Sequence, residues 1–325
     1  KETTRQLLAQ FLGATPEEII ITRNTSEANN MVSLGLDLRR GDEIILFGDN
    51  HPCNKAAWES RRERYGFTIV EIPIVNPHPG AAHYLDAVKR ALTPHTKLLS
   101  FTHHTNTVGD LFPARELCRL ARERGVLTLL DGAQSFGLID FSLADLQPDF
   151  YSASAHKWLC GPKEVGVLYV AARAQSRLWP AIVSSGNGAV GISKTHEAFG
   201  QRDEPAIVAC GEAVKFQFAI GRAAIEARSR ALGQRLMTGL ARLDGVKLYT
   251  SRNPAHSLCV VVFQPGELHP AKLAAALYQN ERIGCTARSG ERPGLRISPH
   301  FYNLPEEVDR TVAAIGRYMK DGLPV

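Results

Sequence analysis

Short apolar runs alternate with helix-like segments along the first half of the chain. The runs are rich in leucine and β-branched residues and too short for core helices, which is typical of buried strands. Between them, apolar residues recur every three or four positions and predict helices over residues 26–38, 55–65, 84–92 and 113–124. The predicted strands cover residues 18–22, 43–47, 67–72, 97–102, 126–130, 150–154 and 166–170. Strands joined by crossover helices indicate an α/β fold with a mostly parallel, doubly wound sheet.

The pattern changes after residue 200. Residues 206–240 are helical in pattern, with a break expected at Gly221. The remaining chain alternates predicted strands with helices, namely strands over 246–249, 257–263 and 294–298 and helices over 270–279 and 305–319. This grouping predicts a smaller α+β domain at the C-terminus. We therefore expect a large domain over residues 1–225 and a small domain over residues 226–325.

Composition narrows the class of protein. The chain has 325 residues, of which 44% are hydrophobic and 22% charged, which is ordinary for globular proteins and excludes a disordered chain. Lys and Arg number 38 against 33 Asp and Glu, and the net charge of +5 is spread along the chain, so we expect no nucleic-acid partner. No apolar run approaches the roughly 18 residues of a membrane span, so we expect no membrane partner.

The cysteine pattern and the first residues bear on the compartment. The six cysteines lie far apart and none forms a Cys-x-x-Cys pair. Because this spacing disfavours zinc and disulfide frameworks, we expect no metal and, by default, the reducing cytoplasm. The chain begins with Lys-Glu-Thr-Thr, without Met, in a segment that is already helical in pattern. We expect a further N-terminal stretch before it, and an exported form stays open because that stretch could carry a signal.

Polar residues follow five of the predicted strands. Ligands in an open α/β sheet bind beyond the carboxyl ends of the strands, so these residues are candidates for a site. The five stretches are Arg23-Asn24-Thr25-Ser26, Gly48-Asp49-Asn50-His51, His103-His104-Thr105-Asn106, Asp131-Gly132-Ala133-Gln134 and Ala155-His156-Lys157-Trp158. Thr25 and Ser26 open a helix, where they form either an anion pocket or a plain N-cap. The absence of Gly-x-Gly-x-x-Gly and Walker motifs argues against a dinucleotide or a nucleoside triphosphate.

Asp131 and Lys157 form the strongest pair among these candidates. Asp131 follows a buried strand, where a carboxylate needs a charged partner or good hydrogen bonds, although a helix N-cap is an equally good reading of this residue alone. Lys157 follows another apolar strand and is flanked by His156 and Trp158. A lysine held there, with its pKa lowered by desolvation, can form a Schiff base, whereas a lysine that reached solvent would need no such neighbours.

A Schiff-base lysine with an acidic partner for a pyridinium nitrogen is what pyridoxal phosphate requires. The chain resembles the fold-type I, class V aminotransferase family, which includes cysteine desulfurases, selenocysteine lyases and isopenicillin N epimerases. The resemblance runs from about Thr3 onward and is densest over residues 102–170, where Asn106, Asp-Gly-Ala-Gln (131–134) and Ser-Ala-His-Lys (154–157) keep the family's order. It implies pyridoxal 5'-phosphate (PLP) as the cofactor and makes residues 1–225 the PLP-binding domain.

The resemblance assigns cofactor roles to individual residues. Lys157 matches the lysine that holds the cofactor as an internal aldimine and moves protons at the substrate Cα, and Asp131 matches the aspartate that keeps the pyridine nitrogen protonated. His51 matches the aromatic residue that stacks on the ring, where isopenicillin N epimerases tend to carry Tyr and desulfurases His. Gln134 matches the residue that hydrogen-bonds the ring's 3-oxygen. The phosphate cradle corresponds to Thr25, Ser26, Ser154 and His156.

The same resemblance implies the substrate contacts. Asn106 matches the asparagine near the 3-oxygen and the substrate carboxylate. Arg296 matches the arginine that grips the α-carboxylate, a task suited to its two-pronged guanidinium. Arg288, in the stretch before it, is a further candidate for substrate binding.

Two positions depart from the family pattern. Desulfurases place a nucleophilic cysteine before the carboxylate arginine, and here Ala287 takes that position, with Cys285 nearby as a half-buried structural thiol. In Phe199-Gly200-Gln201-Arg202-Asp203, Gln201 replaces the family's Thr, which reaches the phosphate of the neighbouring subunit's cofactor. The Gly-x-Arg-Asp context resembles the epimerase-like branch, and an amide N–H can still serve a phosphate.

The resemblance therefore implies a homodimer with shared active sites that acts at the Cα of an amino acid or amino-acid-like substrate, through an external aldimine and a quinonoid. We favour the isopenicillin N epimerase-like branch, with epimerase or aminotransferase chemistry. Two alternatives stay open. One is a C–S lyase of the cysteine desulfurase or selenocysteine lyase type, which predicts an essential Cys285. The other is a non-catalytic scaffold that retains the PLP fold, against which the presence of Lys157, Asp131 and Arg296 argues.

Overall fold

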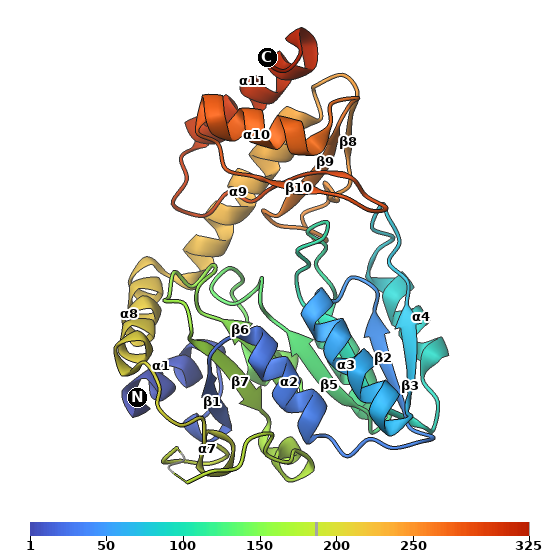
Figure 1. Cartoon of the computed structure of the whole chain (residues 1–325), viewed down its shortest axis with the longest axis vertical. Helices are drawn as coiled ribbons and strands as arrows, with labels where there is room; N and C mark the ends of the chain where they lie inside the picture. The colour runs from blue at the N-terminus through green and yellow to red at the C-terminus, as the bar shows by residue number, and fades with distance from the viewer. Residues whose placement is uncertain (186–187, 325) are drawn as a thin grey trace. The chain divides into compact units, whose positions relative to one another are not determined.

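A seven-stranded sheet forms the centre of the larger of two units in the computed structural model, which describes residues 1–185 and 188–324 (Figure 1). The larger unit contains residues 1–74, 80–103 and 112–222, with the other described residues in the smaller unit. The strand order is β1-β7-β6-β5-β4-β2-β3. The strands are β1 (Ile19–Thr22), β2 (Glu43–Phe47), β3 (Thr68–Ile72), β4 (Thr96–Thr102), β5 (Leu127–Asp131), β6 (Phe150–Ser154) and β7 (Gly166–Val170).

The predicted mostly parallel sheet is confirmed. The five neighbouring strands β6, β5, β4, β2 and β3 are parallel, and β7 runs antiparallel to β6 and to β1 on its other side. Every residue of β6 and β7 is buried, as expected for strands that are covered on both faces. Because parallel strands end at one edge, the polar residues that follow β2, β4, β5 and β6 gather there.

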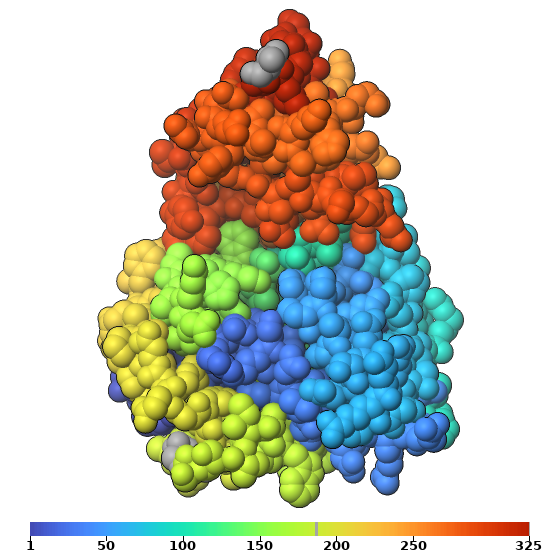
Figure 2. Space-filling view, in the orientation of Figure 1, coloured from blue at the N-terminus to red at the C-terminus, as the bar shows by residue number. Residues whose placement is uncertain are grey.

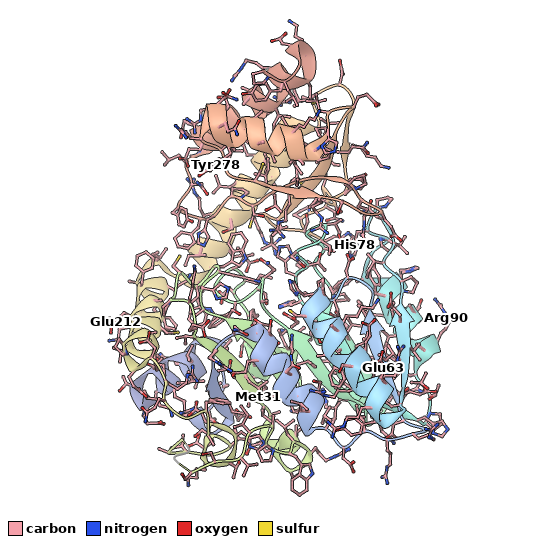
Figure 3. All side chains as sticks on the ribbon, in the orientation of Figure 1. Met31, Glu63, His78, Arg90, Glu212 and Tyr278 are labelled. Atoms are coloured by element: carbon pink, nitrogen blue, oxygen red, sulfur yellow. The ribbon has the colours of Figure 1, made fainter. Side chains whose placement is uncertain are left out.

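Helices cover this sheet and begin where the site residues lie. Figures 1 and 2 show α2 (Thr25–Gly35) and α3 (Pro52–Tyr65) side by side on one face of the larger unit. Figure 3 labels Met31 on α2 and Glu63 on α3; Met31 is buried and Glu63 is exposed, as amphipathic helices require. The other helices of this unit are α1 (Glu2–Leu12), α4 (Ala81–Ala91), α5 (Ala114–Glu123), the short α6 (Leu143–Leu146) and α7 (Ser193–His196), and α8 (Glu204–Ile220).

A buried ion pair ties α1 to the sheet. Arg5 is fully buried, and its Nη1 donates to Glu197 Oε1 at 3.1 Å and to the Ile19 carbonyl at 2.7 Å. The same Glu197 oxygen accepts from the Ile21 amide. The sequence pattern does not reveal this contact, because its two charged residues lie 192 positions apart.

The smaller unit has an antiparallel sheet of order β10-β11-β9-β8. Its elements are α9 (Arg222–Leu240), β8 (Val246–Leu248), β9 (Val261–Pro265), α10 (Pro270–Glu281), β10 (Thr286–Arg288), β11 (Gly294–Ile297) and α11 (Pro305–Asp321). The predicted break at Gly221 is confirmed, with φ 96° between α8 and α9, a backbone conformation that favours glycine. The predicted strand over 257–263 is wrong in its first half, since β9 begins at Val261. β10 was not predicted.

Two loops that lie far from this unit in sequence also belong to it. Residues 75–79 and 104–111 group with the chain from Ala223 onward. Asn76 Nδ2 donates to the Tyr249 carbonyl at 2.7 Å, and Thr250 Oγ1 donates to the Val108 carbonyl at 2.6 Å. The second loop carries Asn106 into the smaller unit, which the predicted boundary near residue 225 did not anticipate.

Within the described residues, no helix has the length and apolar character needed to cross a membrane. The same part of the chain holds no group of three or more His, Cys, Asp or Glu side chains placed to bind a metal ion.

Candidate active site

The carboxyl edge of the large sheet opens into a cavity of about 300 Å³, at the lower end of the range for small-molecule sites. It is formed by the start of α2, the start of α3 and the ends of β5 and β6, all in the larger unit. The structure brings seven of the predicted site residues together around it: Thr25, Ser26, His51, Asp131, Ser154, His156 and Lys157.

The start of α2 offers donors for an anion. The Thr25 amide donates to Ser154 Oγ at 2.8 Å, and the two hydroxyls lie 2.7 Å apart. The backbone comes close here, because a Cβ on Gly166 would lie 2.7 Å from the Asn24 Cα. Hydroxyls at the positive end of a helix fit a phosphate. The Ser26 hydroxyl points elsewhere, since it donates to Cys53 Sγ at 3.1 Å.

Asp131 is the last residue of β5 and is 1% exposed. Its Oδ1 accepts from the Ala133 amide at 3.0 Å, and its Oδ2 accepts from Asn29 Nδ2 at 3.1 Å. Asn29 is oriented in turn by Ser152, whose hydroxyl donates to Asn29 Oδ1 at 2.6 Å. A carboxylate has about four acceptor positions, so the two that remain suit a protonated ring nitrogen. Asn29 was not singled out from the sequence. A polar residue on the buried face of the helix now seen as α2 could have identified it as a site residue.

Lys157 lies in the turn after β6, and its neighbours hold that turn in place. Gln217 Nε2, on α8, donates to the Trp158 carbonyl at 2.7 Å, and the Cys160 amide donates to the Lys157 carbonyl at 3.1 Å. The Trp158 indole N–H donates to Gln134 Oε1 at 2.8 Å. With its oxygen engaged in this way, the amide of Gln134 has N–H donors to offer to another oxygen.

His51 forms a close pair with a residue that the sequence analysis did not single out. His51 Nδ1 and Cys53 Sγ lie 2.7 Å apart, and both residues line the cavity. The hydrogen bond to Cys53 raises the pKa of His51, although burial acts against it. The hydrogen bond to His51 lowers the pKa of Cys53, assisted by the Ser26 hydroxyl and opposed by burial.

Two further predicted cofactor residues are more exposed. His156 lines the cavity, and burial together with the charge of Lys157 lowers its pKa, which favours the neutral imidazole. Gln201 lies on an exposed bend and does not line the cavity of its own chain. Its expected role concerns a neighbouring subunit's cofactor and stays a prediction.

The predicted substrate residues come together within the smaller unit. Arg296 Nη1 and Arg288 Nη1 each donate to the Asn106 carbonyl at 3.2 Å. The two arginines lie on the same face of the β10–β11 pair, because Arg296 pairs with Thr286, two residues before Arg288. Burial lowers the pKa of Arg296, yet a guanidinium stays charged in proteins. No carboxylate of the described residues forms an ion pair with Arg296, which suits the binding of an anion.

The nearby cysteine has the character of a structural thiol. Burial raises the pKa of Cys285 to about 11, so little of it is thiolate at neutral pH. Cys285 and Ala287 pack against the hydrophobic core of the smaller unit.

Comparisons with known proteins agree on one family. Residues 1–311 match the family described as aminotransferase class-V. Isopenicillin N epimerase of Streptomyces clavuligerus is 32% identical over 329 residues, covering 96% of this chain and 82% of that protein. The structure of a cysteine desulfurase from Thermococcus onnurineus NA1 superimposes with a TM-score of 0.88 at 27% identity, covering 98% of this chain and 84% of that one. A C-DES variant with glycine covalently linked to its PLP cofactor shares the fold, with a TM-score of 0.89 at 24% identity and coverage of 97% and 84%.

Proposed function

Since the chain belongs to the aminotransferase class-V family and is a PLP-dependent enzyme of that family, we propose that it acts at the Cα of an amino acid or amino-acid-like substrate with isopenicillin N epimerase-like chemistry. The observation that carries this proposal is the meeting of three groups in one cavity: the amine of Lys157, the buried carboxylate of Asp131 and the hydroxyl-bearing start of α2. These groups match an aldehyde, a pyridine nitrogen and a phosphate, which are the three functional parts of PLP.

Each group has its own task in this proposal. PLP supplies an aldehyde that bonds to amines and a ring that withdraws electrons from Cα. Lys157 would hold the cofactor through its amine and would accept the proton from Cα. Asp131 keeps a proton on the ring nitrogen, because its carboxylate is held in place by Asn29 and the Ala133 amide. Thr25, Ser154 and the start of α2 hold the phosphate.

The substrate's carboxylate is the natural partner of Arg296. Arg296 is half-buried and has no carboxylate partner among the described residues, while Arg288 lies beside it on the same strand pair. Two guanidinium groups bind carboxylates strongly through paired N–H donors. We expect a homodimer in which Gln201 reaches the neighbouring subunit's cofactor.

Our choice of epimerase-like chemistry over C–S bond cleavage rests on the nucleophile. No suitable nucleophile stands at the position where desulfurases carry their reactive cysteine. Ala287 occupies it, and the raised pKa of Cys285 leaves that thiol protonated near neutral pH. Both points favour epimerisation or transamination over C–S bond cleavage. The desulfurase-type alternative is favoured by His51, which desulfurases carry at the stacking position, and it predicts that Cys285→Ala abolishes sulfide release.

Visible spectroscopy of the purified protein tests the proposal. We expect an absorption band of lysine-bound cofactor that Lys157→Ala lacks. Addition of single amino acids should change the band for one class of substrate. An inverted amino acid as product supports epimerisation, a keto acid supports transamination, and sulfide or selenide supports the lyase alternative. A wild-type protein that takes up no added PLP would overturn the proposed function.

A further inference from the structure

Cys53 stands apart from the other cysteines of the chain. It lies in the first turn of α3, directly on the cavity wall, whereas Cys118, Cys210 and Cys259 are buried and Cys285 belongs to the smaller unit. Its sulfur is 2.7 Å from His51 Nδ1 and accepts a hydrogen bond from the Ser26 hydroxyl at 3.1 Å. A sulfur that accepts from a hydroxyl and touches an imidazole at a helix N-terminus is in the setting that stabilises a thiolate.

We propose that Cys53 and His51 form a proton-sharing pair, and that this pair is a proton donor and acceptor of the cofactor cavity in addition to Lys157. Cys53 acts through His51 and is a positioning residue, while His51, which also lines the cavity, is the member proposed to exchange protons with the substrate. The pairing itself is a property of this chain. Its role in turnover rests on the proposed function.

The geometry supports a pair rather than two independent side chains. His51 is the N-cap of α3, and its Nδ1, when unprotonated, also accepts from the Cys53 amide at 3.3 Å, so the imidazole and the thiol are held on the same turn. Since Nδ1 faces the sulfur, Nε2 is the ring nitrogen that can bond to another group. A proton that moves between sulfur and Nδ1 therefore changes whether His51 is imidazole or imidazolium.

The other charged groups of the cavity act on this pair in a defined way. Asp131, at the end of β5, raises the pKa of both His51 and Cys53 through its negative charge. Lys157, after β6, lowers the pKa of His51. The hydrogen bond from His51 lowers the pKa of Cys53 and outweighs the opposing effect of Asp131. The thiolate–imidazolium form of the pair therefore persists to a lower pH than the thiolate of an isolated cysteine.

The pair gives the cavity the second group that inversion at Cα needs. The Cα–H bond breaks as Lys157 takes the proton, and His51 in its imidazolium form gives a proton to Cα. Lys157 then returns its proton to water, and the Cys53–His51 pair regains one, so no proton is lost or gained over a turnover. General acid–base groups of this kind contribute about 10²–10⁴-fold to rates.

Thiolate absorbance in the ultraviolet, titrated with pH in the holoenzyme, tests the pairing. The difference between wild type and Cys53→Ser isolates the signal of Cys53. We expect it to ionise below the ordinary thiol value of about 8.5. His51→Gln should move this ionisation up by at least one pH unit, a tenfold change in the ionisation constant, and Ser26→Ala should move it up by less.

Cys160 provides the matched control. It is exposed and belongs to the same unit, and burial of its sulfur raises its pKa. The difference between wild type and Cys160→Ser should therefore ionise at a higher pH than the signal of Cys53, and His51→Gln should leave it unchanged. A Cys53 signal at or above about 8.5 in the wild type, or one that His51→Gln does not move, overturns the pairing.

Inversion at the substrate Cα, followed through the chirality of the product, tests the role in turnover. Rates are divided by the visible cofactor band, so that each loaded site counts equally. We expect Cys53→Ser to slow inversion by about 10²-fold and to shift its pH profile. Inversion at the wild-type rate and pH profile in Cys53→Ser overturns the role of the pair in turnover. A wild-type protein without a cofactor band would instead contradict the proposed function, and the thiolate titration would still decide the pairing.

Discussion

The cavity of the larger unit and the arginine hairpin of the smaller unit are constructed in different ways. The arginine hairpin is the antiparallel pair of β10 and β11, which carries Arg288 and Arg296. The cavity draws side chains from parallel strands and two helices, and its central carboxylate is fixed by two hydrogen bonds. The hairpin consists of strands of three and four residues, and its two arginines share one backbone carbonyl. The groups that must be placed accurately are thus carried by the large, buried sheet. The long and adaptable arginine side chains are carried by the short strands of the smaller sheet.

This difference indicates that the cavity determines the chemical activity and that the hairpin determines the affinity for the substrate. Changes in the cavity should affect every substrate alike, because the chemistry at Cα is common to all amino acids. Changes in the hairpin should leave the cofactor in place and alter only the grip on the substrate. Four substitutions test this division.

Asp131→Asn should have the largest effect. The amide keeps the size of the side chain but removes the negative charge that we propose faces the ring nitrogen, so turnover should fall by about 10³-fold for every substrate. Turnover per loaded site, measured against the visible band, checks this. Asp149→Asn is the matched control, because Asp149 is also buried and accepts from the Thr128 amide at 2.8 Å, but it does not line the cavity. Turnover of Asp131→Asn within tenfold of wild type would refute the assigned role of the carboxylate.

Arg296→Lys should act on the substrate alone. Lysine keeps the charge but loses the two-pronged donor geometry, and a charged hydrogen bond of this kind is worth about 1.5–3 kcal/mol. We expect kcat/KM to fall by about 10- to 100-fold, mainly through KM, with an unchanged cofactor band. Arg235→Lys, on the exposed side of α9 in the same unit, is the control. Loss of the cofactor band in Arg296→Lys would contradict the separation of the two regions.

The sequence predicted those parts of the fold that depend on a pattern within one short segment of the chain. Buried parallel strands appear in the sequence as apolar runs, so the ends of β5 and β6 were predicted to within a residue, and with them the positions of Asp131 and Lys157 at those ends. The roles of these two residues stay predictions. The pair of Cys53 and His51 also has a local signal, a cysteine two residues after a helix-capping histidine, but it was not recognised.

The parts that it missed depend on contacts between distant segments. Asn76 bonds to Tyr249 across 173 positions, and no periodicity marks such a contact. This is why the two loops of the smaller unit were not assigned to it. Strand β10 was missed because Thr286–Arg288 is too short to show an alternating pattern and follows Gly284. Its existence depends on pairing with β11.

Gly166→Ala probes the close backbone approach behind the phosphate cradle. The added Cβ would lie 2.6 Å from the Ala153 carbonyl oxygen and 2.7 Å from the Asn24 Cα, so the start of α2 must shift. We expect the dissociation constant for PLP to rise by about tenfold, equivalent to ~1.4 kcal/mol. Gly284→Ala is the control, since a Cβ there meets no atom within 4 Å among the described residues. Equal PLP affinity in Gly166→Ala and wild type would show that the cradle tolerates the shift.

Trp158→Phe should have the smallest effect and the most specific one. It removes the indole N–H that holds Gln134 Oε1 while keeping the aromatic bulk beside Lys157. A hydrogen bond of this kind is worth about 0.5–1.5 kcal/mol, so turnover should fall only about 3- to 10-fold. The pH at which the visible band changes should shift as well, because Gln134, which we expect to bond the ring oxygen, then loses its fixed orientation. Trp158→Phe and Gln134→Ala should not be additive, since Trp158 acts through Gln134. Full additivity would mean that Trp158 only fills space, and the fine positioning of the cavity would then lie with Gln217 and the backbone of the Lys157 turn.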